Sequence, residues 1–470
     1  MERRKTSTTH VGAIAIGSDN PIRVQSMTTT NTNDTQACVE QAKRIIDAGG
    51  ELVRLTTQGR REAENLKNIS AALRAEGYQT PLVADVHFNA NVADVAALYA
   101  EKVRINPGNY VDPARTFKHL EYTDEEYAAE LEKIEQRLKP FIDICKEHKT
   151  AVRIGVNHGS LSDRIMSRYG DTPEGIVESC MEFLRIFRKY DFHDIVISIK
   201  ASNTVVMVQS VRLLVQQMDK EDMHYPLHLG VTEAGEGEDG RIKSAVGIGA
   251  LLTEGIGDTI RVSLSEEPEE EIPVAKKLVE LIDECAALRR QAEATIKDDT
   301  ITLELPDNPE SPDQWETLQL KAAMAVGALL IDRKATKLII SLTSNPSPQG
   351  RGTTLDPNLL STLADAILQA ARIKFTKTEY ISCPGCGRTL YDLRTTIARI
   401  KEATKDLVGL KICIMGCIVN GPGEMADADY GYVGAGPGRI SLYRRKECVE
   451  KNIPEEEAVE RLLALIKKEA

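Results

Sequence analysis

Short apolar runs rich in β-branched residues recur through the first part of the chain, and stretches with helical spacing separate several of them. The runs are IRVQSM (22–27), LVRLTT (52–57), PLVADVHF (81–88), KVRINPGN (102–109), AVRIGVNHGS (151–160), DIVISIKASN (194–203), PLHLGVTEAG (226–235) and DTIRVSLSEEP (258–268). Between two of them, TQACVEQAKRIIDAGG (35–50) has apolar residues at helical spacing and ends in glycine. Alternating strands and helices favour a parallel sheet, and eight repeats are typical of a (β/α)8 barrel. We therefore expect an α/β protein with a TIM-type barrel over residues 1–285; an open doubly wound sheet is the alternative.

Polar residues gather at the second half of these runs, where the strands of a parallel barrel open onto one face. They are Arg54, Asp85, His87, Asn89, Arg104, Asn106, Arg153, Asn157, Lys200, Asn203, Glu233, Arg261 and Ser263. Five are cations, and although one such cation commonly pairs with a carboxylate or reaches solvent, five at one mouth would repel one another without an anion. Arginine forks suit phosphate oxygens, and lysine adds a point charge. The pattern predicts a small substrate with more than one phosphate.

Composition and charge limit the remaining possibilities. The chain has 470 residues, 42% of them hydrophobic, which suggests two or three domains. A net charge of -12 argues against binding to nucleic acid or to an anionic membrane. The longest uncharged apolar run, 322–331, is too short to span a bilayer, and no apolar stretch that would suggest a signal peptide follows MERRKTSTTHVG. Nine scattered cysteines do not resemble a disulfide framework, so we expect a cytoplasmic setting.

A helix–strand unit of the barrel has a partial copy further along the chain. GALLTEGIGDTIRVSLSEEP (249–268) is echoed by GALLIDRKATKLIISLTSNP (327–346), in which apolar strand positions are kept and Arg261 becomes Ile339. The echo indicates either a duplicated unit kept for packing or chance similarity. The charged stretch 295–315 precedes the strand of the copy and is typical of a linker with a short strand inside. We therefore expect residues 286–375 to form a short αβ insert with a partial internal repeat.

The last part of the chain carries cysteines at ligand-like spacing. A strand, 376–382, leads into CPGC; a helix, 393–407, and a strand, 409–417, follow, so we expect an α+β domain over residues 376–470. Cys383, Cys386 and Cys417 are candidate metal ligands, and a Gly-Pro-Gly turn could fold Glu424 back as a fourth. Cys413 is expected to be a buried strand residue.

Three kinds of site compete for these ligands. Structural zinc prefers four cysteines or a mixture of cysteine and histidine, and no histidine follows His228. A redox dithiol would leave Cys417 without a role. Three thiolates and a weak oxygen ligand fit a [4Fe–4S] cluster with one iron open to a substrate oxygen. Spacing alone leaves zinc open.

Several long motifs, in order, resemble one enzyme family. They are VQSMTTTNT (24–32), VRINPGN (103–109), VRIGVNHGSL (152–161), VTEAGEG (231–237), GIGDTIRVSLSEEP (255–268), ISCPGCGRT (381–389) and IMGCIVNGPGE (414–424). The chain resembles the 4-hydroxy-3-methylbut-2-enyl diphosphate synthases, iron–sulfur enzymes of the methylerythritol phosphate route to isoprenoids. The resemblance covers residues 10–285 and 373–445.

The resemblance implies a reaction and a set of roles. The substrate would be 2-C-methyl-D-erythritol 2,4-cyclodiphosphate, opened and dehydroxylated with two electrons from flavodoxin or ferredoxin. The implied cluster ligands are Cys383, Cys386, Cys417 and Glu424; the implied proton-handling carboxylate is Glu233. The implied diphosphate contacts are Arg54, Arg104, Arg153, Lys200 and Arg261, assisted by Asn89, Asn106, Asn157 and Ser263. Carbon–oxygen reduction in single-electron steps needs a cofactor, because side chains cannot supply the electrons.

The insert departs from the resemblance. The family has a compact two-domain form and a longer form with a third domain between barrel and cluster domain, and 286–375 is too short to build that whole domain. In the compact form, the cluster domain caps the partner's barrel, so we expect a homodimer. The rival functions are a barrel lyase or aldolase that uses Lys200 as a Schiff base beside a structural zinc ribbon, and a non-enzymatic electron-transfer module.

Overall fold

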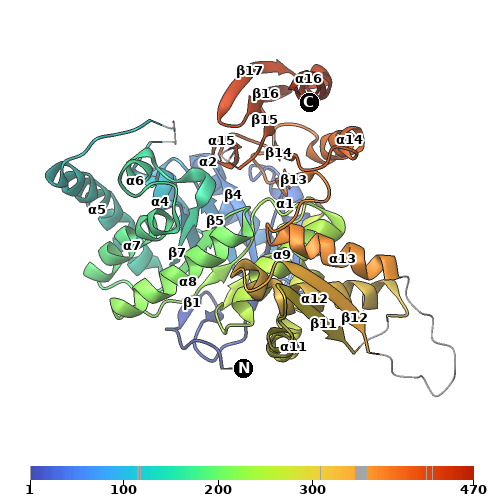
Figure 1. The fold of residues 1–470 in the computed structure, drawn as a ribbon. Coiled ribbons are helices and arrows are strands. Elements are labelled where there is room, and N and C mark those ends of the chain that lie inside the picture. Colours follow the sequence, from blue (N-terminus) through green and yellow to red (C-terminus); the bar gives the residue numbers. More distant parts are fainter. Residues whose placement is uncertain are drawn as a thin grey trace.

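The computed structural model describes residues 2–113, 116, 118–306, 309–343, 357–419, 421–425 and 427–469. Eight parallel strands close into a barrel in its N-terminal part (Figure 1). They are β3 (Arg23–Met27), β4 (Leu52–Thr57), β5 (Leu82–Val86), β6 (Lys102–Ile105), β7 (Ala151–Asn157), β8 (Ile195–Lys200), β9 (His228–Leu229) and β10 (Thr259–Ile260). Their order is β8-β7-β6-β5-β4-β3-β10-β9, and a parallel bridge between Ile197 and Leu227 joins the two ends. The predicted barrel is thus confirmed, and the open sheet is excluded.

Two of the eight strands are much shorter than their apolar runs predict. β9 and β10 have two residues each. Beyond β9, a side chain at Gly230 would lie 2.6 Å from the Lys200 Nζ atom and 2.9 Å from the Arg261 carbonyl oxygen. The backbone after β9 therefore packs directly against Lys200 and Arg261 at the barrel mouth, where the regular strand ends.

Helices surround the barrel and follow from amphipathic spacing and local caps. They are α1 (Thr35–Asp47), α2 (Arg60–Ala75), α3 (Ala90–Ala96), α4 (Pro107–Tyr110), α5 (Asp124–His148), α6 (Asp163–Tyr169), α7 (Pro173–Lys189), α8 (Thr204–Lys220), α9 (Gly237–Leu252), α10 (Glu271–Glu280) and α11 (Ile282–Ala294), with 3-10 turns at His158–Ser160 and Pro268–Glu270. In α1, Cys38, Ala42 and Ile45 face the core, and Asp34 accepts the Ala37 N–H as the N-cap.

A hairpin closes the end of the barrel opposite the polar strand ends. It consists of β1 (Thr9–Val11) and β2 (Ile14–Ile16), which pair antiparallel. Its Val11 and Ile16 side chains pack on inward residues of the barrel strands, among them Leu52 and Val83. This end is apolar and sealed, so the opposite end is left for chemistry.

The insert packs against the barrel as part of one core. It contains β11 (Thr300–Leu305), α12 (Pro312–Ile331), β12 (Lys337–Leu342) and α13 (Pro357–Ala370), with β11 and β12 forming a parallel pair. The predicted strand inside the linker is therefore present. The helix α12 is buried along α9, and insert residues belong to the same apolar cluster as the barrel.

The two copies of the repeated sequence lie side by side. The first copy begins in α9 and the second in α12, and these two helices pack against each other. The echo's last residues, 344–346, lie outside the described residues.

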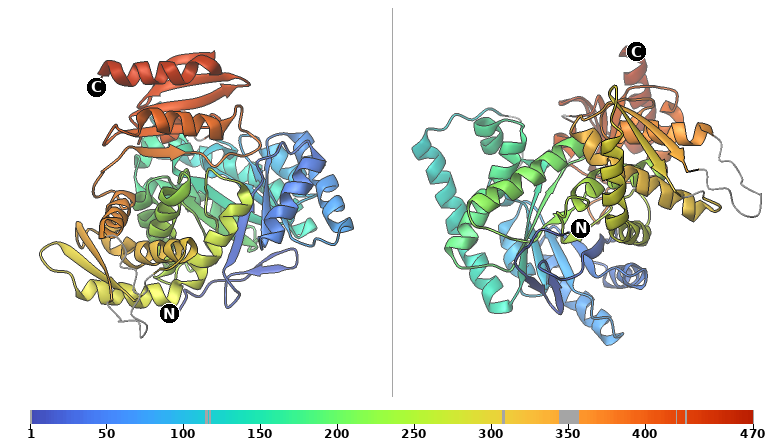
Figure 2. Two further views of the ribbon diagram at one scale, coloured as in Figure 1. Left: turned by 90° about the vertical axis from the view of Figure 1, so that its right-hand side faces the viewer. Right: turned by 60° about the horizontal axis from the view of Figure 1, so that its bottom comes forward.

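The C-terminal residues form a separate layer above the barrel mouth (Figures 1 and 2). It has β13 (Glu379–Ser382), α14 (Leu393–Thr404), β14 (Lys411–Met415), α15 (Gly421–Glu424), β15 (Tyr430–Gly436), β16 (Arg439–Arg444), β17 (Glu447–Pro454) and α16 (Glu455–Glu469). The five strands form one mixed sheet in chain order, over an apolar cluster of their own. The predicted strand–helix–strand around CPGC is confirmed. We call this layer the cluster domain.

Over the part of the chain that the structure describes, no helix combines the length and apolar character needed to cross a membrane.

The contact between α9 and α12 predicts how the insert contributes to stability. A β-carbon added at Gly327 would lie 2.8 Å from the Val246 carbonyl oxygen, which is backbone and cannot turn away. We expect Gly327→Val to lower the free energy of unfolding by about 1–3 kcal/mol, because overpacking forces the helices apart. Calorimetric unfolding measures this. Gly436→Ala is the matched control, since its added β-carbon would meet only the Arg439 side chain at 3.8 Å; an equal loss in both variants would contradict the argument.

Candidate active site

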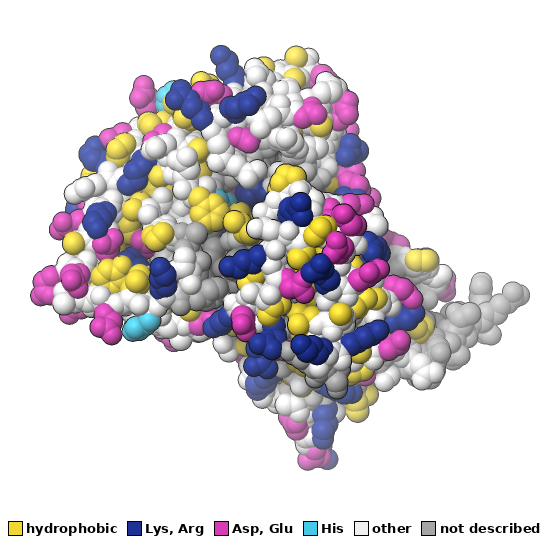
Figure 3. All heavy atoms as spheres, turned by 90° about the horizontal axis from the view of Figure 1, so that it is seen from above, with side chains coloured by type: hydrophobic (Ala, Val, Ile, Leu, Met, Phe, Trp, Pro, Cys, Tyr) yellow, Lys and Arg dark blue, Asp and Glu magenta, His cyan; other side chains and the backbone are white. Residues whose placement is uncertain are grey.

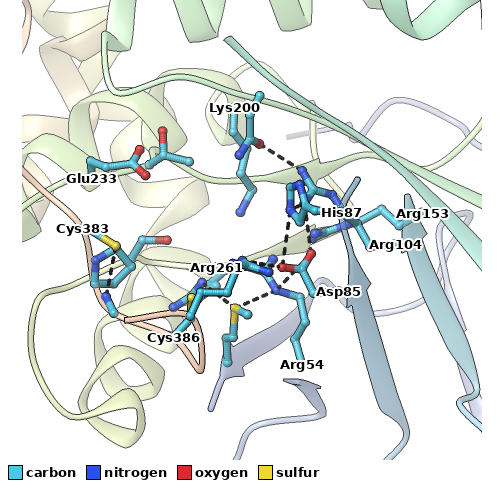
Figure 4. A pocket seen from close by; sticks show the side chains of 17 residues that line it. Arg54, Asp85, His87, Arg104, Arg153, Lys200, Glu233, Arg261, Cys383 and Cys386 are labelled. Atoms are coloured by element: carbon cyan, nitrogen blue, oxygen red, sulfur yellow. Dashed lines mark hydrogen bonds and ion pairs between the residues drawn. The ribbon is translucent and has the colours of Figure 1, made fainter. Parts of the chain in front are cut away.

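The predicted strand-end cations meet in one pocket at the barrel mouth (Figure 4). Side chains of a strand alternate in direction, so residues two apart point to the same side. The pocket has a cavity volume of about 70 Å³. Its predicted members are Arg54, Arg104, Arg153, Asn157, Lys200, Glu233, Arg261, Ser263, Cys383 and Cys386.

Two of the five cations donate hydrogen bonds to carboxylates, and a third, Arg54, lies 4.0 Å from Asp85 Oδ1. Arg104 donates from Nη1 to Asp85 Oδ1 at 3.0 Å. Arg261 donates through Nε and Nη2 to the two oxygens of Glu271, both at 2.9 Å. Glu271 also accepts from the Ser26 hydroxyl, which fixes the fork in place. These pairs orient two guanidinium groups without neutralising the pocket.

The other cations leave a surplus of positive charge. Arg153 is buried, and its Nε and Nη1 atoms have no hydrogen-bond partner among the described residues. Burial, followed by repulsion from Arg54, lowers the pKa of both Arg153 and Lys200 well below the ordinary values. Buried donors and mutually repelling cations are the features that a bound anion would relieve.

Two predicted substrate contacts do not reach the pocket. Asn89 is exposed, and its side chain accepts the Asn91 N–H as the N-cap of α3. Asn106 is buried, but its side chain donates to the Ser160 hydroxyl and accepts from the Gly108 N–H. Both residues shape the loops that follow β5 and β6.

Three titratable residues that line the pocket had been given no role by the sequence analysis. Asp85 and His87 were noted only as polar strand-end residues. Burial, followed by the charge on Arg104, lowers the pKa of His87 well below its usual range, so the imidazole is neutral. Arg388 comes from the cluster domain, and its two-residue distance from Cys386 was the one signal that it could reach the site.

The CPGC loop forms one wall of the same pocket. Cys383 follows β13, and barrel contacts hold it: Ser265 donates its hydroxyl to the Cys383 carbonyl oxygen at 3.0 Å, and Ala234 forms a parallel bridge with Ser382. Figure 4 shows Cys383 and Cys386 facing Arg54 and Asp85 across the pocket. In this structure the cluster domain therefore covers the barrel of its own chain. The homodimer stays a prediction.

The three candidate cysteine ligands are neighbours. Burial, and then the charge on Cys386, raises the pKa of the Cys383 thiol and raises that of Cys417 to about 11. Thiols that perturb one another beneath a covering domain suit a group that binds several thiolates, such as an iron–sulfur cluster. In the described residues, no three His, Cys, Asp or Glu side chains are arranged to hold a single metal ion.

Glu424 lies at the junction of the two domains. Its Oε2 accepts the Ser202 hydroxyl of the barrel at 2.5 Å, and the residue is 3% exposed. Burial, followed by the nearby Glu233, raises the pKa of Glu424 to about 8. The preceding residue, Gly423, has backbone contact with Gly159 of the barrel, where no side chain would fit.

Cys413 is the buried strand residue that the sequence predicted, and Cys448 is half-buried. Cys413 is buried in β14, and burial raises the pKa of its thiol well above the usual value. Cys38, Cys145, Cys180 and Cys285 are likewise buried.

Comparison with known proteins identifies the family. The GcpE TIM-barrel domain matches residues 6–276, and the GcpE protein C-terminal domain matches residues 379–468. The chain belongs to the GcpE family. A relative from Bacteroides fragilis is 52% identical over 99% of this chain and 96% of its own length; relatives from Porphyromonas gingivalis and Akkermansia muciniphila are 44% and 42% identical. All three are named 4-hydroxy-3-methylbut-2-en-1-yl diphosphate synthase (flavodoxin), so this GcpE chain has enzymes of that name as relatives.

This GcpE chain is shorter than that relative. The alignment with the Bacteroides fragilis protein runs over 607 positions, whereas this chain has 470 residues. A stretch of the relative therefore has no counterpart here.

The lowered pKa of Lys200 predicts that anion binding takes up a proton. A bound anion offsets burial and repulsion, so it raises the pKa of Lys200 and the bound state holds more protons. Affinity for inorganic pyrophosphate should be highest below the free-state pKa of Lys200 and should fall as the pH rises through it. Calorimetry in buffers of different ionisation enthalpy measures the uptake.

Two variants separate this effect from the titration of pyrophosphate itself. Lys200→Met should abolish the Lys200 contribution. Lys276→Met should leave it intact, because Lys276 binds the Ala48 carbonyl oxygen outside the pocket. Equal proton uptake in the Lys200→Met and unmodified proteins would refute the assignment.

Proposed function

We propose that this chain catalyses the reductive ring opening and dehydroxylation of 2-C-methyl-D-erythritol 2,4-cyclodiphosphate to 4-hydroxy-3-methylbut-2-enyl diphosphate. The observation that carries the proposal is the shared pocket, which barrel cations line together with Cys383 and Cys386 of the cluster domain. The names of the relatives support the reaction. A cyclic diphosphate would offset the surplus positive charge at the mouth.

The cofactor that we propose is a [4Fe–4S] cluster held by Cys383, Cys386, Cys417 and Glu424. When bound, it would supply the electrons one at a time, which side chains cannot do. The donor set of three soft thiolates and one oxygen suits iron. The relatives' names support flavodoxin as the electron donor.

Each part of the pocket would have its own task. Arg153, whose Nε and Nη1 atoms have no hydrogen-bond partner among the described residues, would donate to the diphosphate together with Arg54, while Arg104, Arg261 and Lys200 would contribute charge. Asn157 and Ser263 line the same pocket and would add polar contacts. Because the phosphate end is fixed, the end that reacts would stay against the CPGC wall.

The two acidic residues would handle protons. The leaving hydroxyl needs a proton to depart as water, and a carboxyl with a pKa of about 8 can hold one at neutral pH. Glu424 and Glu233 influence each other's charge, so we assign them jointly to this step. Glu424 would serve as the oxygen ligand only in its ionised form, so it would hold the proton only when it is not bound to the cofactor.

The zinc-ribbon lyase remains a second candidate because of Lys200. A buried lysine with a lowered pKa is suited to Schiff-base formation. That function predicts zinc instead of iron, and inactivation by borohydride in the presence of substrate.

Metal analysis tests the proposed cofactor first. Protein purified without oxygen should contain about four iron and four sulfide per chain, with a broad absorption band near the blue edge of the visible range. Cys417→Ser should lose most of the iron. Cys448→Ser is the control, because Cys448 lies in β17 and its thiol donates to the Glu450 carbonyl oxygen. Zinc without sulfide, even after reconstitution, would favour the lyase.

Mixing two inactive variants tests whether the cluster domain serves its own barrel. Cys383→Ser removes a proposed cluster ligand, and Arg261→Ala removes a proposed diphosphate contact. Since both sites lie in one pocket of one chain, we expect the mixture to stay inactive in a flavodoxin-driven assay. Recovered activity would instead require capping of the barrel by a partner's cluster domain.

A further inference from the structure

A second polar layer lies inside the barrel, beneath the pocket. Lys102 precedes Arg104 by two residues on β6, so both side chains point to the interior and Lys102 lies deeper. In the strand ladder, Lys102 is in register with Val83 and Ala151, which belong to the apolar cluster beneath the barrel formed with the β1–β2 hairpin. Lys102 is not one of the residues that line the pocket. It therefore lies between the pocket and the sealed end of the barrel.

The amino group of Lys102 is buried without a partner. The residue is 0% exposed, and its Nζ atom has no hydrogen-bond partner among the described residues. The charged groups that act on it are Arg153 of β7 and then Arg54 of β4, both cations. Lys102 also acts on His228 of β9, whose imidazole is neutral because burial, followed by the charge on Lys200, lowers its pKa well below the usual range. These neighbours include no carboxylate.

Uncharged polar groups share this layer. Gln25 of β3 is in register with Leu52, which belongs to the same apolar cluster as Val83, so Gln25 lies at a depth similar to that of Lys102. Its Nε2 atom is 2.6 Å from His228 Nδ1. Gln25 Oε1 and the Ser198 hydroxyl are buried and have no hydrogen-bond partner among the described residues. Acceptors at this depth can stabilise a charged amine, directly or through a buried water.

The charge on Lys102 therefore depends on what occupies the pocket above it. Burial, followed by repulsion from Arg153, lowers the pKa of Lys102 well below the ordinary value, so the amine of the free protein is readily left neutral. A diphosphate bound beside Arg153 and Arg54 brings negative charge over this layer and raises the pKa of Lys102. By linkage, the ammonium that forms attracts the diphosphate in return. The proton enters through the pocket, because the hairpin seals the other end.

We propose that Lys102 is a proton-binding site beneath the substrate pocket, which takes up a proton from solvent when a diphosphate binds above it and so strengthens binding without touching the ligand. The proposal rests on the proposed function only for the identity of the natural anion. Lys102 differs in this from Lys200, which lines the pocket. The role accounts for a fully buried lysine that has no carboxylate partner and lies outside the pocket lining.

The test is calorimetric titration of the full chain with inorganic pyrophosphate, over a series of pH values and in buffers of different ionisation enthalpy. Lys102→Met is neutral at every pH, and comparison with the unmodified protein at the same pH cancels the titration of pyrophosphate itself. Lys102→Met should raise Kd by about 3- to 30-fold below the free-state pKa of Lys102, as expected for one charge at a distance in the interior. The difference should shrink as the pH rises and vanish above the bound-state pKa of Lys102. Between the two pKa values, the variant should take up fewer protons and keep the Lys200 contribution.

Three further variants separate proton binding from packing. Lys102→Gln is also neutral and should lose the same proton uptake, which keeps the test available if the methionine variant does not fold. Lys276→Met is the uptake control, because Lys276 binds the Ala48 carbonyl oxygen outside the pocket.

Lys243→Met is the stability control. Lys243 is also buried, but it donates to Glu379 at 3.0 Å, so its removal should lower the unfolding temperature. Lys102→Met should raise that temperature in the free protein, because an apolar side chain of similar length replaces an unpaired buried amine.

The outcomes discriminate between the two proposals. If both Lys102 variants match the unmodified protein in Kd and proton uptake at every pH, the role of Lys102 is wrong and the proposed function is unaffected. If Kd rises equally at all pH values, Lys102 acts through packing and the proton-binding role is also wrong. A pH-dependent loss with pyrophosphate, together with no binding of 2-C-methyl-D-erythritol 2,4-cyclodiphosphate by the unmodified protein, would support the role of Lys102 and refute the proposed function. If the unmodified protein binds neither anion, both proposals fail.

Discussion

The repulsion among buried cations at the barrel mouth is the constraint on which the other features of the site depend. Arg54, Arg153 and Lys200 are held close together by strands that the barrel ladder fixes, so they cannot move apart. Asp85 and Glu271 orient two further arginines and leave the surplus in place. Buried charges of one sign lower the stability of the free protein and are retained where a ligand uses them.

The cluster domain covers these buried cations and contributes a further one, Arg388. Contacts between the domains are polar and local: Ser265 with the Cys383 carbonyl oxygen, Ser202 with Glu424, and Arg388 with Asp85. Each domain keeps its own apolar cluster. On the face seen from above, acidic and basic side chains are intermixed (Figure 3).

The sequence allowed the barrel and its cations to be predicted, because both depend on periodicity. Eight apolar runs predict eight strands. A polar residue at the end of a parallel strand is expected at the mouth of the barrel. Asn89 and Asn106 also follow strand ends, yet they do not reach the pocket, because their side chains cap the N-termini of α3 and α4. Local capping competes with a site for short polar side chains. Arg388 was missed for a different reason: its contact with Asp85 joins residues 303 positions apart, and no local pattern contains that information.

The insert shows how a short connection can fix the position of a domain. Arg372, just after α13, contacts both Glu379 at the start of β13 and Asp427 beyond α15, at 3.1 and 2.6 Å. Glu379 also accepts from Lys243 of α9 at 3.0 Å, and the Thr204 hydroxyl donates to the Ala370 carbonyl oxygen. Barrel, insert and cluster domain thus meet at one buried ionic network. Because α12 shares its core with α9, this network is anchored to the barrel itself. A chain that lacks part of its relatives' length can therefore still present its cysteines to its own cation pocket.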